Sequence, residues 1–575
     1  MVKIMQQTYK NPIYPYTPCR ELNAEEQLHH PVIIVGAGPG GLALAVDLAL
    51  QGIKSVVIDN NNTVSVGSRA ICFAKRTLEI MQRLGCAERM LKKGVTWRHG
   101  KVFFKNEEVY DFNLLEESDH QVPAFINLQQ YYFEEYLVDR AAEFDLIDLR
   151  WKSKVISLVS HEKMTQVIVS TPDGEYTMTC DFLLCADGAN SPVRKMLGLE
   201  SKGQVFQDRF LIADVVMKAA FPTERWFWFD PPFHPNQSAL LHKQPDNVWR
   251  IDLQLGWDAD PAHEKQEHVI RPRIQAMLGE DAEFELEWAS VYTFQCRKME
   301  RFIHNRVIFV GDAAHQVSPF GARGANGCIQ SAENLVWKLA KVLKKQAPLE
   351  LIETYDIERQ HAAKENILNS TRSTDFITPK NHISRIFRDQ TLLLAKTHDF
   401  ARTMVNSGRL STPCQYVNSP LNTPDDDNFC SLLAPGCVPK DAPIFIARQQ
   451  DWLINHLGNQ FVALISYKQI TAMQQQYLET LGKHPLLKLL VLCPGSVNTK
   501  LPENVTVIQD VKGILAQRYD LQNGTTYLFR PDQIITARWR QCSAEQVIGA
   551  VNRALGFELT GPVSNASSIH EEVII

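Results

Sequence analysis

The N-terminal part of the chain alternates between apolar runs and a glycine-rich break. Pro31–Val35 is an apolar run of the kind found in buried parallel strands, and Ser55–Ile58 is a second one. Between them, residues 36–41 are rich in glycine and lead into an apolar stretch at Leu42–Gln51 that is typical of a buried helix. This order predicts a βαβ unit.

The pattern then changes to alternating strands. Helical spacing of Leu and Ile occurs at Arg76–Leu84 and at Gln130–Phe144. Residues 101–112 and 205–296 instead carry alternating strands, such as Trp249–Leu255, separated by proline-rich turns. This arrangement predicts an antiparallel sheet that is inserted into the first domain.

The C-terminal half returns to the first domain and then starts another. Val307–Val310 is strand-like, and helices are expected at about Gln330–Leu343 and from Leu349 to Lys396. Ser411–Asp427 is rich in Ser, Pro, Asn and Asp, which predicts a linker. Beyond it we expect strands at Gln460–Ile465, Leu487–Val491 and Tyr527–Phe529 and a helix at Ala544–Leu555.

The composition excludes several classes of protein. The chain has 575 residues, 45% of them hydrophobic and 22% charged, as in globular proteins of several domains. Its net charge of −5 lacks the basic excess of nucleic-acid-binding proteins. Residues 1–30 lack the apolar core of a signal peptide, and no run of 18 apolar residues predicts a membrane span. The 12 cysteines form no Cys-x-x-Cys pair, so we expect no metal site. Together, these features predict a cytoplasmic protein with neither nucleic acid nor a membrane as a partner.

A dinucleotide-binding fingerprint follows the first predicted strand. Gly36-Ala-Gly-Pro-Gly-Gly41 fits G-x-G-x-x-G, and Asp59 follows at about the expected spacing. Gly36 permits the tight turn, Gly38 lets a pyrophosphate approach the backbone, and Gly41 allows close packing of helix on strand. Asp59 is expected to bind an adenosine ribose. The residues predicted to contact the cofactor here are Gly36, Gly38, Pro39, Gly40, Gly41 and Asp59. Alone, the motif does not distinguish NAD from FAD.

A second glycine-rich segment, residues 311–327, follows the strand that ends at Val310. Asp312 is placed there to accept hydrogen bonds from a polyol such as the ribityl chain of a flavin. The helix after this segment directs its N-terminal N–H groups, near Gly324–Asn326, toward the same place. A reduced flavin is anionic at its N1 and O2 edge, so the positive pole of the helix favours a flavin.

Several segments resemble those of a known family. Cys185-Ala-Asp-Gly-Ala-Asn-Ser-Pro-Val-Arg194 resembles the DG motif of the flavoprotein hydroxylases, which include p-hydroxybenzoate and phenol hydroxylases. Gly311–Gly327, continuing to Asn334–Leu339, resembles their GD motif. Ser68–Ile80 resembles the segment in which the family places an arginine, here Arg69, near the cofactor. The resemblance implies FAD as the cofactor.

The resemblance also implies further cofactor contacts. Asn127–Gln130 resembles the family's flavin-contacting glutamine segment, and we choose Gln129 over Gln130. From the other motifs it implies Asp187, Gly311, Asp312, Pro319, Gly324, Ala325 and Asn326.

The chain departs from the family in the GD segment. Ser318-Pro319 replaces a Pro-Pro pair, and Ala322-Arg323-Gly324 replaces Gly-Gln-Gly. Arg323 could bind an anionic substrate or point to solvent, and the sequence does not decide between them. His315 is better explained as a hydrogen-bonded structural residue than as a catalytic one.

The inserted sheet offers candidates for an aromatic pocket. They are Trp226, Trp228, Phe229, His234, His242, Arg250, Tyr292 and Arg297. Each one alone is better explained as a core or surface residue than as a ligand contact. Trp226-Phe-Trp-Phe229-Asp-Pro also resembles the W-x-W-x-I-P signature of flavin-dependent halogenases without its isoleucine, although a strand of alternating aromatics explains it better.

The C-terminal region from about Cys430 resembles the thioredoxin-like domain of phenol hydroxylase-type members. Cys493 has no partner in Cys-x-x-Cys, so we expect a packing or oligomerisation role rather than redox chemistry. The predicted fold class is α/β: a Rossmann-like FAD-binding domain, an inserted antiparallel substrate domain and a C-terminal thioredoxin-like domain. The expected bounds are an N-terminal extension at 1–30, FAD-binding segments at 31–100, 125–204 and 300–400, substrate-domain segments at 101–124 and 205–299, a linker at 411–428 and the C-terminal domain at 429–575.

The resemblance implies a monooxygenase. NADPH or NADH reduces FAD, O₂ adds to give a flavin C4a-hydroperoxide, and an aromatic substrate, phenolic or an aromatic acid, is hydroxylated. The sequence singles out no catalytic base and does not decide whether the chain forms a homodimer. The alternatives are a flavin-dependent dehydrogenase or reductase, a halogenase, and a non-catalytic FAD-binding sensor.

Overall fold

The computed structural model describes residues 8–67, 69–219, 221–406, 411–495 and 500–559. These described residues form two compact units, the first from those within 1–333 and 363–413 and the second from those within 334–362 and 414–575.

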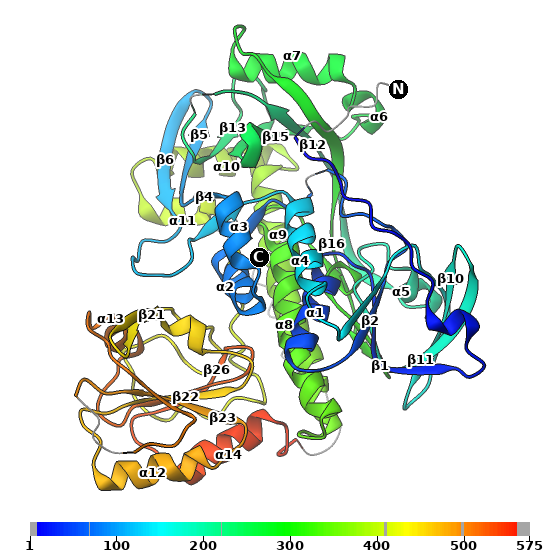
Figure 1. The fold of residues 1–575 in the computed structure, drawn as a ribbon. Helices are drawn as coiled ribbons and strands as arrows, with labels where there is room; N and C mark the ends of the chain where they lie inside the picture. The colour runs from blue at the N-terminus through cyan, green and yellow to red at the C-terminus, as the bar shows by residue number, and fades with distance from the viewer. Residues whose placement is uncertain (1–7, 68, 220, 407–410, 496–499, 560–575) are drawn as a thin grey trace. The chain divides into compact units, whose positions relative to one another are not determined.

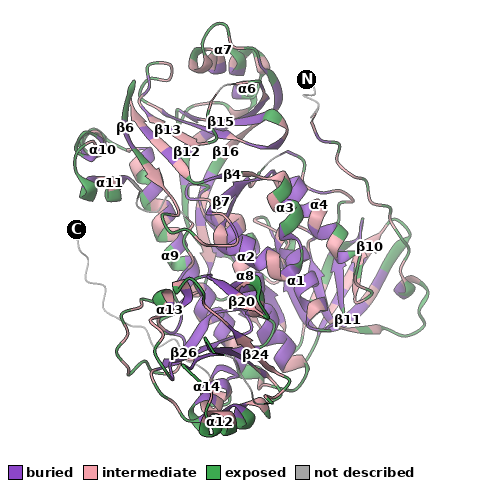
Figure 2. Cartoon of the chain, turned by 60° about the vertical axis from the view of Figure 1, so that its left-hand side comes forward, coloured by how far each residue is buried: buried purple, intermediate pink, exposed green. Residues whose placement is uncertain are grey.

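The first unit is built on a largely parallel sheet of strand order β17-β18-β11-β1-β2-β8 (Figure 1). Four of its strands are β1 (Leu28–Val35), β2 (Ser55–Ile58), β11 (Gly174–Cys185) and β18 (Val307–Phe309). The edge strands are β8 (Ile147–Arg150) and β17 (Ile303–His304), and β9 (Lys154–Ser160) and β10 (Thr165–Thr171) extend β11 as an antiparallel meander. Helix α1 (Pro39–Leu50) follows β1 and is almost wholly buried (Figure 2). The predicted βαβ unit is therefore present.

A second sheet in this unit has the order β19-β16-β12-β15-β14-β13-β5-β6. The strands are β5 (His99–Phe104), β6 (Glu107–Asn113), β12 (Ser201–Val216), β13 (Arg225–Phe229), β14 (Ser238–Lys243), β15 (Val248–Leu255), β16 (Glu285–Met299) and β19 (His315–Gln316). All pairs are antiparallel except β13 with β5. The sheet extends beyond the expected segments, since β19 comes from the GD segment.

The two faces of this sheet carry different residues. One face packs on α7 (Glu267–Leu278) through an apolar cluster that includes Trp249 and Ile274, near the short α6 (Pro261–Glu264). We call the opposite face, which carries Phe210, Phe227 and Phe229, the inner face.

The remaining elements of the first unit surround these sheets. A small sheet is formed by β3 (Cys72–Ala74), β4 (Val95–Trp97) and β7 (Phe125–Asn127). The helices are α2 (Lys75–Leu84), α3 (Ala87–Lys93), α4 (Gln130–Ala141), α5 (Pro192–Met196), α10 (His382–Ala395) and α11 (Asp399–Asn406). Two longer helices, α8 (Arg323–Leu343) and α9 (Glu353–Ile377), contribute residues to both units. Among the described helices, none is long and apolar enough to cross a bilayer.

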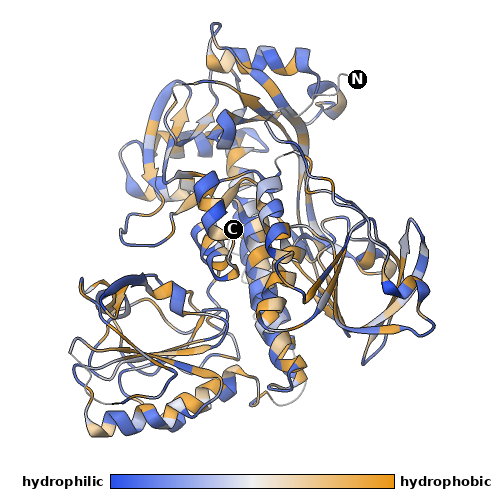
Figure 3. Ribbon diagram, in the orientation of Figure 1, coloured by the Kyte–Doolittle hydropathy of each residue, from blue (hydrophilic) through white to orange (hydrophobic). Residues whose placement is uncertain are grey.

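The second unit contains a five-stranded sheet of order β24-β23-β22-β25-β26. The strands are β22 (Phe461–Ser466), β23 (Leu487–Leu492), β24 (Val505–Ile508), β25 (Thr526–Phe529) and β26 (Ile535–Trp539). Helices α12 (Ala472–Gly482) and α14 (Ala544–Ala554) pack on one face, and α13 (Ile514–Tyr519), β20 (Pro443–Ile446) and β21 (Gln449–Trp452) pack on the other. The strands are mostly hydrophobic (Figure 3). A βαβ unit followed by a β-hairpin and a helix on the α12 face is the arrangement expected of a thioredoxin-like domain.

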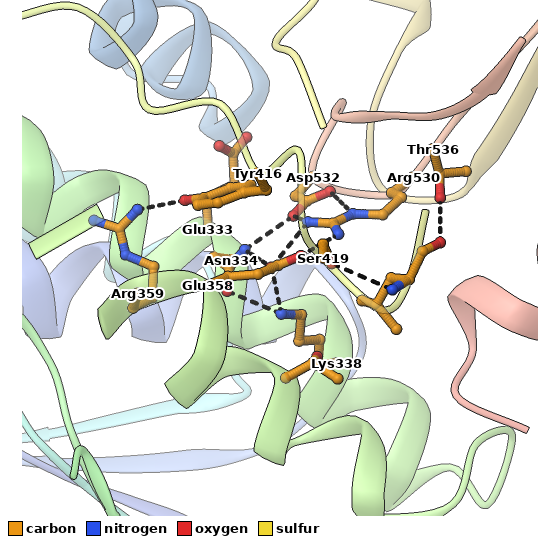
Figure 4. A network of polar contacts seen from close by, with 12 residues as sticks. Glu333, Asn334, Lys338, Glu358, Arg359, Tyr416, Ser419, Arg530, Asp532 and Thr536 are labelled. Atoms are coloured by element: carbon orange, nitrogen blue, oxygen red, sulfur yellow. Dashed lines mark hydrogen bonds and ion pairs between the residues drawn. The ribbon is translucent and has the colours of Figure 1, made fainter. Parts of the chain in front are cut away.

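A buried network of charges lies within the second unit (Figure 4). The Glu358 carboxylate accepts hydrogen bonds from Arg530 Nη1 at 2.6 Å, Lys338 Nζ at 2.7 Å and Ser419 Oγ at 2.6 Å. Burial alone would raise the pKa of Glu358, but Arg530 and Lys338 hold it well below its usual range. Because buried charges are tolerated only when paired, this network fixes the helices to the β25–β26 hairpin.

The predicted linker packs against β26 of the five-stranded sheet. Thr423 N donates to Thr536 O at 2.8 Å, and Asp425 forms an ion pair with Arg538 at 2.7 Å. Composition identified a segment without helix or strand, but not that its acidic side chains pair with arginines of β26 and the residues after it.

Candidate functional site

The carboxyl ends of four neighbouring strands bring the three sequence motifs together. In the order β18-β11-β1-β2, adjacent parallel strands end at the same edge of the sheet. Backbone hydrogen bonds continue past the strand ends: Gly36 N donates to Ile58 O, Ala186 N to Val35 O and Val310 N to Cys185 O, at 2.8 to 2.9 Å. The segments that begin at Gly36, Asp59, Asp187 and Asp312 therefore lie side by side.

The glycines of the first turn differ in what surrounds them. Gly36 has a φ of +102°, and a Cβ atom there would lie 2.5 Å from Ala186 O. A Cβ on Gly41 would lie 1.8 Å from Gly36 O, so this position needs glycine for packing alone. A Cβ on Gly38 would meet no protein atom within 4 Å. Open space in front of Gly38, at the start of α1, is what a pyrophosphate needs.

The neighbouring residues of the turn are held in place. Pro39 is the first residue of α1, and Gly40 packs against Cys328, since a Cβ there would lie 2.4 Å from its Sγ. Asp59 accepts hydrogen bonds from Ala37 N at 2.7 Å and Asn61 N at 2.8 Å. It therefore stabilises the glycine turn, and its remaining lone pairs are available to a ribose.

Asp312 combines exposure with desolvation. The residue is exposed, yet burial raises the pKa of its carboxyl group to about 6, while Arg69 lowers it. The Asp312 carboxylate is therefore accessible to a ligand although neighbouring protein atoms partly desolvate it. Within the described residues, its carboxylate has no hydrogen-bond or ion-pair partner. Gly311 before it has a φ of +63°.

The start of α8 is tied to the first unit through Asn326. Its Oδ1 accepts from Ala74 N at 2.9 Å and Thr77 Oγ1 at 2.6 Å, and its Nδ2 donates to Cys72 O at 2.9 Å. Because this side chain is fully engaged, any contact with a cofactor falls to the main-chain N–H groups of the first helical turn, which have no partner within the helix. Gly324 and Ala325 belong to the same turn.

Of the two sequence hypotheses for Arg323, the structure contradicts the solvent-facing one. Arg323 is buried, and its Nη1 donates to Asn366 Oδ1 on α9 at 3.0 Å. Burial lowers the pKa of its guanidinium to about 10. Ala322 before it has a φ of +55°, a conformation that glycine adopts more readily.

The two glutamines at the start of α4 have different roles. Gln130 accepts from Ala70 N at 3.0 Å and donates to Glu134 at 2.8 Å, so both ends of its amide are engaged. Gln129 is buried, and its Oε1 has no partner among the described residues.

The other motif residues take structural positions. Asp187 accepts from Ser191 Oγ and Val193 N and thereby supports the start of α5, while its Oδ1 has no partner in the described chain. Pro319 is exposed in the turn before α8, and His315 is buried and stacks on Phe302.

The alternation of side chains along each strand places the candidate pocket residues on different faces of the second sheet. Trp226 and Trp228 belong to the α7 side of the second sheet, and His234 caps a turn by bonding to Gln254 O at 2.6 Å. The inner face carries Phe229, His242, Arg250 and Tyr292. Arg297 lies on β16 opposite Gln316.

Sequence reasoning missed three charged residues of the inner face. These are Asp214, Arg225 and Asp252, on β12, β13 and β15. Asp214 pairs with Arg250 at 3.0 Å, and both are buried. The available signal was a charge at every second position in apolar strands, as in Arg250-Ile-Asp252.

The chain is similar to flavin-dependent proteins of known activity. The family described as "FAD binding domain" matches residues 29–370. A 12-dehydrotetracycline 5-monooxygenase/anhydrotetracycline 6-monooxygenase of Streptomyces rimosus is 30% identical over 367 residues, covering 60% of this chain and 69% of the relative. A 3-(3-hydroxy-phenyl)propionate/3-hydroxycinnamic acid hydroxylase of Burkholderia cenocepacia is 28% identical, covering 69% and 72%.

A solved structure supports the fold along most of the chain. The flavin-dependent monooxygenase PieE, in complex with FAD and substrate, superposes with a TM-score of 0.78 at 20% identity, covering 92% of this chain and 99% of that one.

Proposed function

Because the chain belongs to the FAD-binding family of flavoprotein monooxygenases, we propose that it hydroxylates an aromatic substrate with FAD, NAD(P)H and O₂. The observation that carries the proposal is the edge of the first sheet, where an open Gly38, a ribose-accessible Asp59 and an unpaired Asp312 meet. Relatives named as hydroxylases of aromatic compounds support the reaction type.

The residues present fit FAD. The N–H groups at the start of α1 would hold the pyrophosphate, Asp59 the adenosine ribose and Asp312 the ribityl hydroxyls. Arg69 lies close enough to Asp312 to lower its pKa, and the unpaired Gln129 Oε1 is free to accept a hydrogen bond. The positive end of α8 would stabilise negative charge on the ring. When bound, FAD supplies the redox chemistry that connects NAD(P)H oxidation to O₂.

The inner face of the second sheet is the proposed substrate wall. Its aromatic side chains continue to Phe320, which lies 5.0 Å from Phe210 and 5.2 Å from Phe294 between ring centroids. Phe320 directly precedes Gly321 of the GD segment, so this wall reaches the proposed flavin site. A water-poor aromatic surface beside the cofactor suits the hydroxylation of a ring.

The experiment is the reconstitution of purified protein with FAD, followed by assays with NADH and NADPH on a panel of phenols and aromatic acids. We expect a yellow protein, substrate-stimulated NAD(P)H oxidation and one hydroxylated product per O₂ consumed. A colourless protein that takes up no FAD would overturn the proposal. Oxidation of substrate without O₂ uptake would favour a dehydrogenase instead.

The halogenase alternative loses its support. The two tryptophans of the halogenase-like signature lie on the α7 side of the sheet, away from the inner face. They are alternate residues of β13, as a strand interpretation requires.

A further inference from the structure

Three polar side chains on the inner face have no partner in the described structure. They are Arg225 on β13, His242 on β14 and Asp252 on β15. His242 is 2% exposed, and its Nδ1 makes no hydrogen bond, nor does Asp252 Oδ1. Because buried polar atoms in folded proteins are normally hydrogen-bonded, His242 Nδ1 and Asp252 Oδ1, with the half-buried Arg225 on the same face, indicate a site for a polar ligand group.

Sheet register places the three side chains together. His242 is paired with Arg250, and Asp252 is paired with Leu240, which in turn is paired with Phe227. Paired residues and residues two apart on a strand share a face, so Arg225, His242 and Asp252 all lie on the inner face. Arg225 is half-buried, yet desolvation lowers the pKa of its guanidinium, and Asp252 opposes this shift. Part of the Arg225 surface therefore remains accessible to a ligand.

The cluster adjoins the proposed flavin site. Burial raises the pKa of the Cys72 thiol to about 11 against the opposing effect of Arg225 and Arg250. Cys72 is therefore close to both arginines. The carbonyl of Cys72 accepts from Asn326 in the first turn of α8. Arg250 Nη1 also donates to the carbonyl of Arg69 at 3.0 Å.

The charges around the cluster balance. Arg250 is neutralised by Asp214, and Arg225 faces Asp252 without a direct bond. Burial raises the pKa of Asp252 to about 6, so it is ionised at neutral pH, whereas burial lowers the pKa of His242 well below its usual value and keeps it uncharged. Arg69, near Tyr292, is opposed by Asp312 and Glu134. A ligand carboxylate would therefore add an uncompensated buried charge.

We propose that Arg225, His242 and Asp252 form the polar end of the substrate site and hold an electrically neutral aromatic compound with a hydroxyl group next to a carbonyl oxygen. The hydroxyl donates to Asp252, and the carbonyl accepts from Arg225. The aromatic ring then lies along Phe227 and the apolar residues of the inner face. This inference rests on the proposed function and narrows its substrate class from phenols and aromatic acids to neutral hydroxy-carbonyl aromatics.

The test uses FAD-loaded enzyme and two matched pairs of probes. Salicylamide and 1-hydroxy-2-naphthamide are neutral, whereas salicylate and 1-hydroxy-2-naphthoate have nearly the same shape and carry a charge. Binding is measured from the change in flavin absorbance on titration. We expect at least one amide to bind at least tenfold more tightly than its carboxylate. Equal or tighter binding of both carboxylates, or no saturable binding of either amide, would overturn the inference.

Variants locate the binding on this cluster. Arg225→Gln and Asp252→Asn should each weaken amide binding at least tenfold. Arg209→Gln is the matched control, since Arg209 lies on β12 and bonds to the Ala259 carbonyl instead. Unchanged amide affinity in both cluster variants would overturn the assignment. Failure of the wild-type protein to load FAD, by contrast, would overturn the proposed function itself.

Discussion

At the scale of single residues, Asp312 should bind the cofactor while lowering the stability of the apoprotein at neutral pH. Asp312→Asn removes the charge that accepts polyol hydroxyls, and hydrogen bonds to charged groups contribute about 1.5 to 3 kcal/mol. We therefore expect FAD to bind about 10- to 100-fold more weakly, as measured by titration of flavin fluorescence. Asp145→Asn is the control, because Asp145 is exposed and precedes β8 rather than following the carboxyl end of a strand. Unchanged FAD affinity would contradict the role of Asp312.

The same variant should make the apoprotein more stable in a pH-dependent way. The folded-state pKa of Asp312, about 6, lies above its ordinary value, so the folded apoprotein binds a proton more tightly than the unfolded chain. Stability from this group is present at low pH and is lost as pH rises through 6. Because asparagine does not ionise, the Asp312→Asn variant does not lose this stability as the pH rises. The melting temperature of the FAD-free variant should exceed that of the wild type at pH 8 and match it at pH 4, and a difference of equal size at both values would exclude this cause.

Gly38 and Gly41 give a matched pair of substitutions. Gly38→Val introduces a side chain into open space at a φ of −77°, which valine tolerates, so the apoprotein should fold but bind no FAD. Gly41→Ala places a methyl group 1.8 Å from the Gly36 carbonyl, so it should destabilise the fold itself. Far-ultraviolet circular dichroism and flavin absorbance separate the two effects. A yellow Gly38→Val protein would contradict the pyrophosphate site.

Residue type and spacing predicted much of this site, but not the direction of each side chain. The strand ends followed from apolar runs that stop at glycine or aspartate, as at Val35 and Val310. Arg323 shows the limit. Whether an arginine after a glycine-rich turn faces ligand, solvent or core depends on how α9 packs, and here it is buried against Asn366.

At the scale of elements, alternation predicted strands but not which face carries the chemistry. β13 was recognised from its aromatic residues, yet its tryptophans pack toward α7, while Arg225 and Phe227 face inward. Register decides this, because a shift of one residue exchanges the two faces. The pairing of β13 with β5 is parallel and joins segments far apart in the chain, which no local pattern reveals.

The buried network around Glu358 should be a major source of stability in the second unit. Removing one partner of a buried ion pair leaves an unpaired charge and costs about 3 to 5 kcal/mol. Glu358→Ala should therefore lower the free energy of unfolding by about that amount, measured by urea denaturation. Glu350→Ala, an exposed glutamate of the η4 turn (Leu349–Leu351), should change it by less than about 0.5 kcal/mol. Equal effects in the two variants would show that the network contributes little.

At the scale of the whole molecule, the two units should respond separately to the cofactor. All residues proposed to contact FAD lie in the first unit, and Glu358 lies in the second. FAD at 100 times its dissociation constant should stabilise the folded first unit by about 2.7 kcal/mol. Helix α8 is the element through which the two units could be coupled. It begins at the proposed flavin site, and its residues Asn334 and Lys338 belong to the Glu358 network.

If the two units are energetically independent, Glu358→Ala should leave the dissociation constant of FAD within twofold of wild type, while Gly38→Val should leave the urea unfolding of the second unit unchanged. The reason is that α8 is anchored near its start by Asn326, whose side-chain bonds are all made within the first unit. Loosening the distal half of the helix therefore does not free its first turn. FAD titration of Glu358→Ala measures this directly, and a tenfold loss of affinity would show instead that the network in the second unit positions the helix terminus that is proposed to face the flavin.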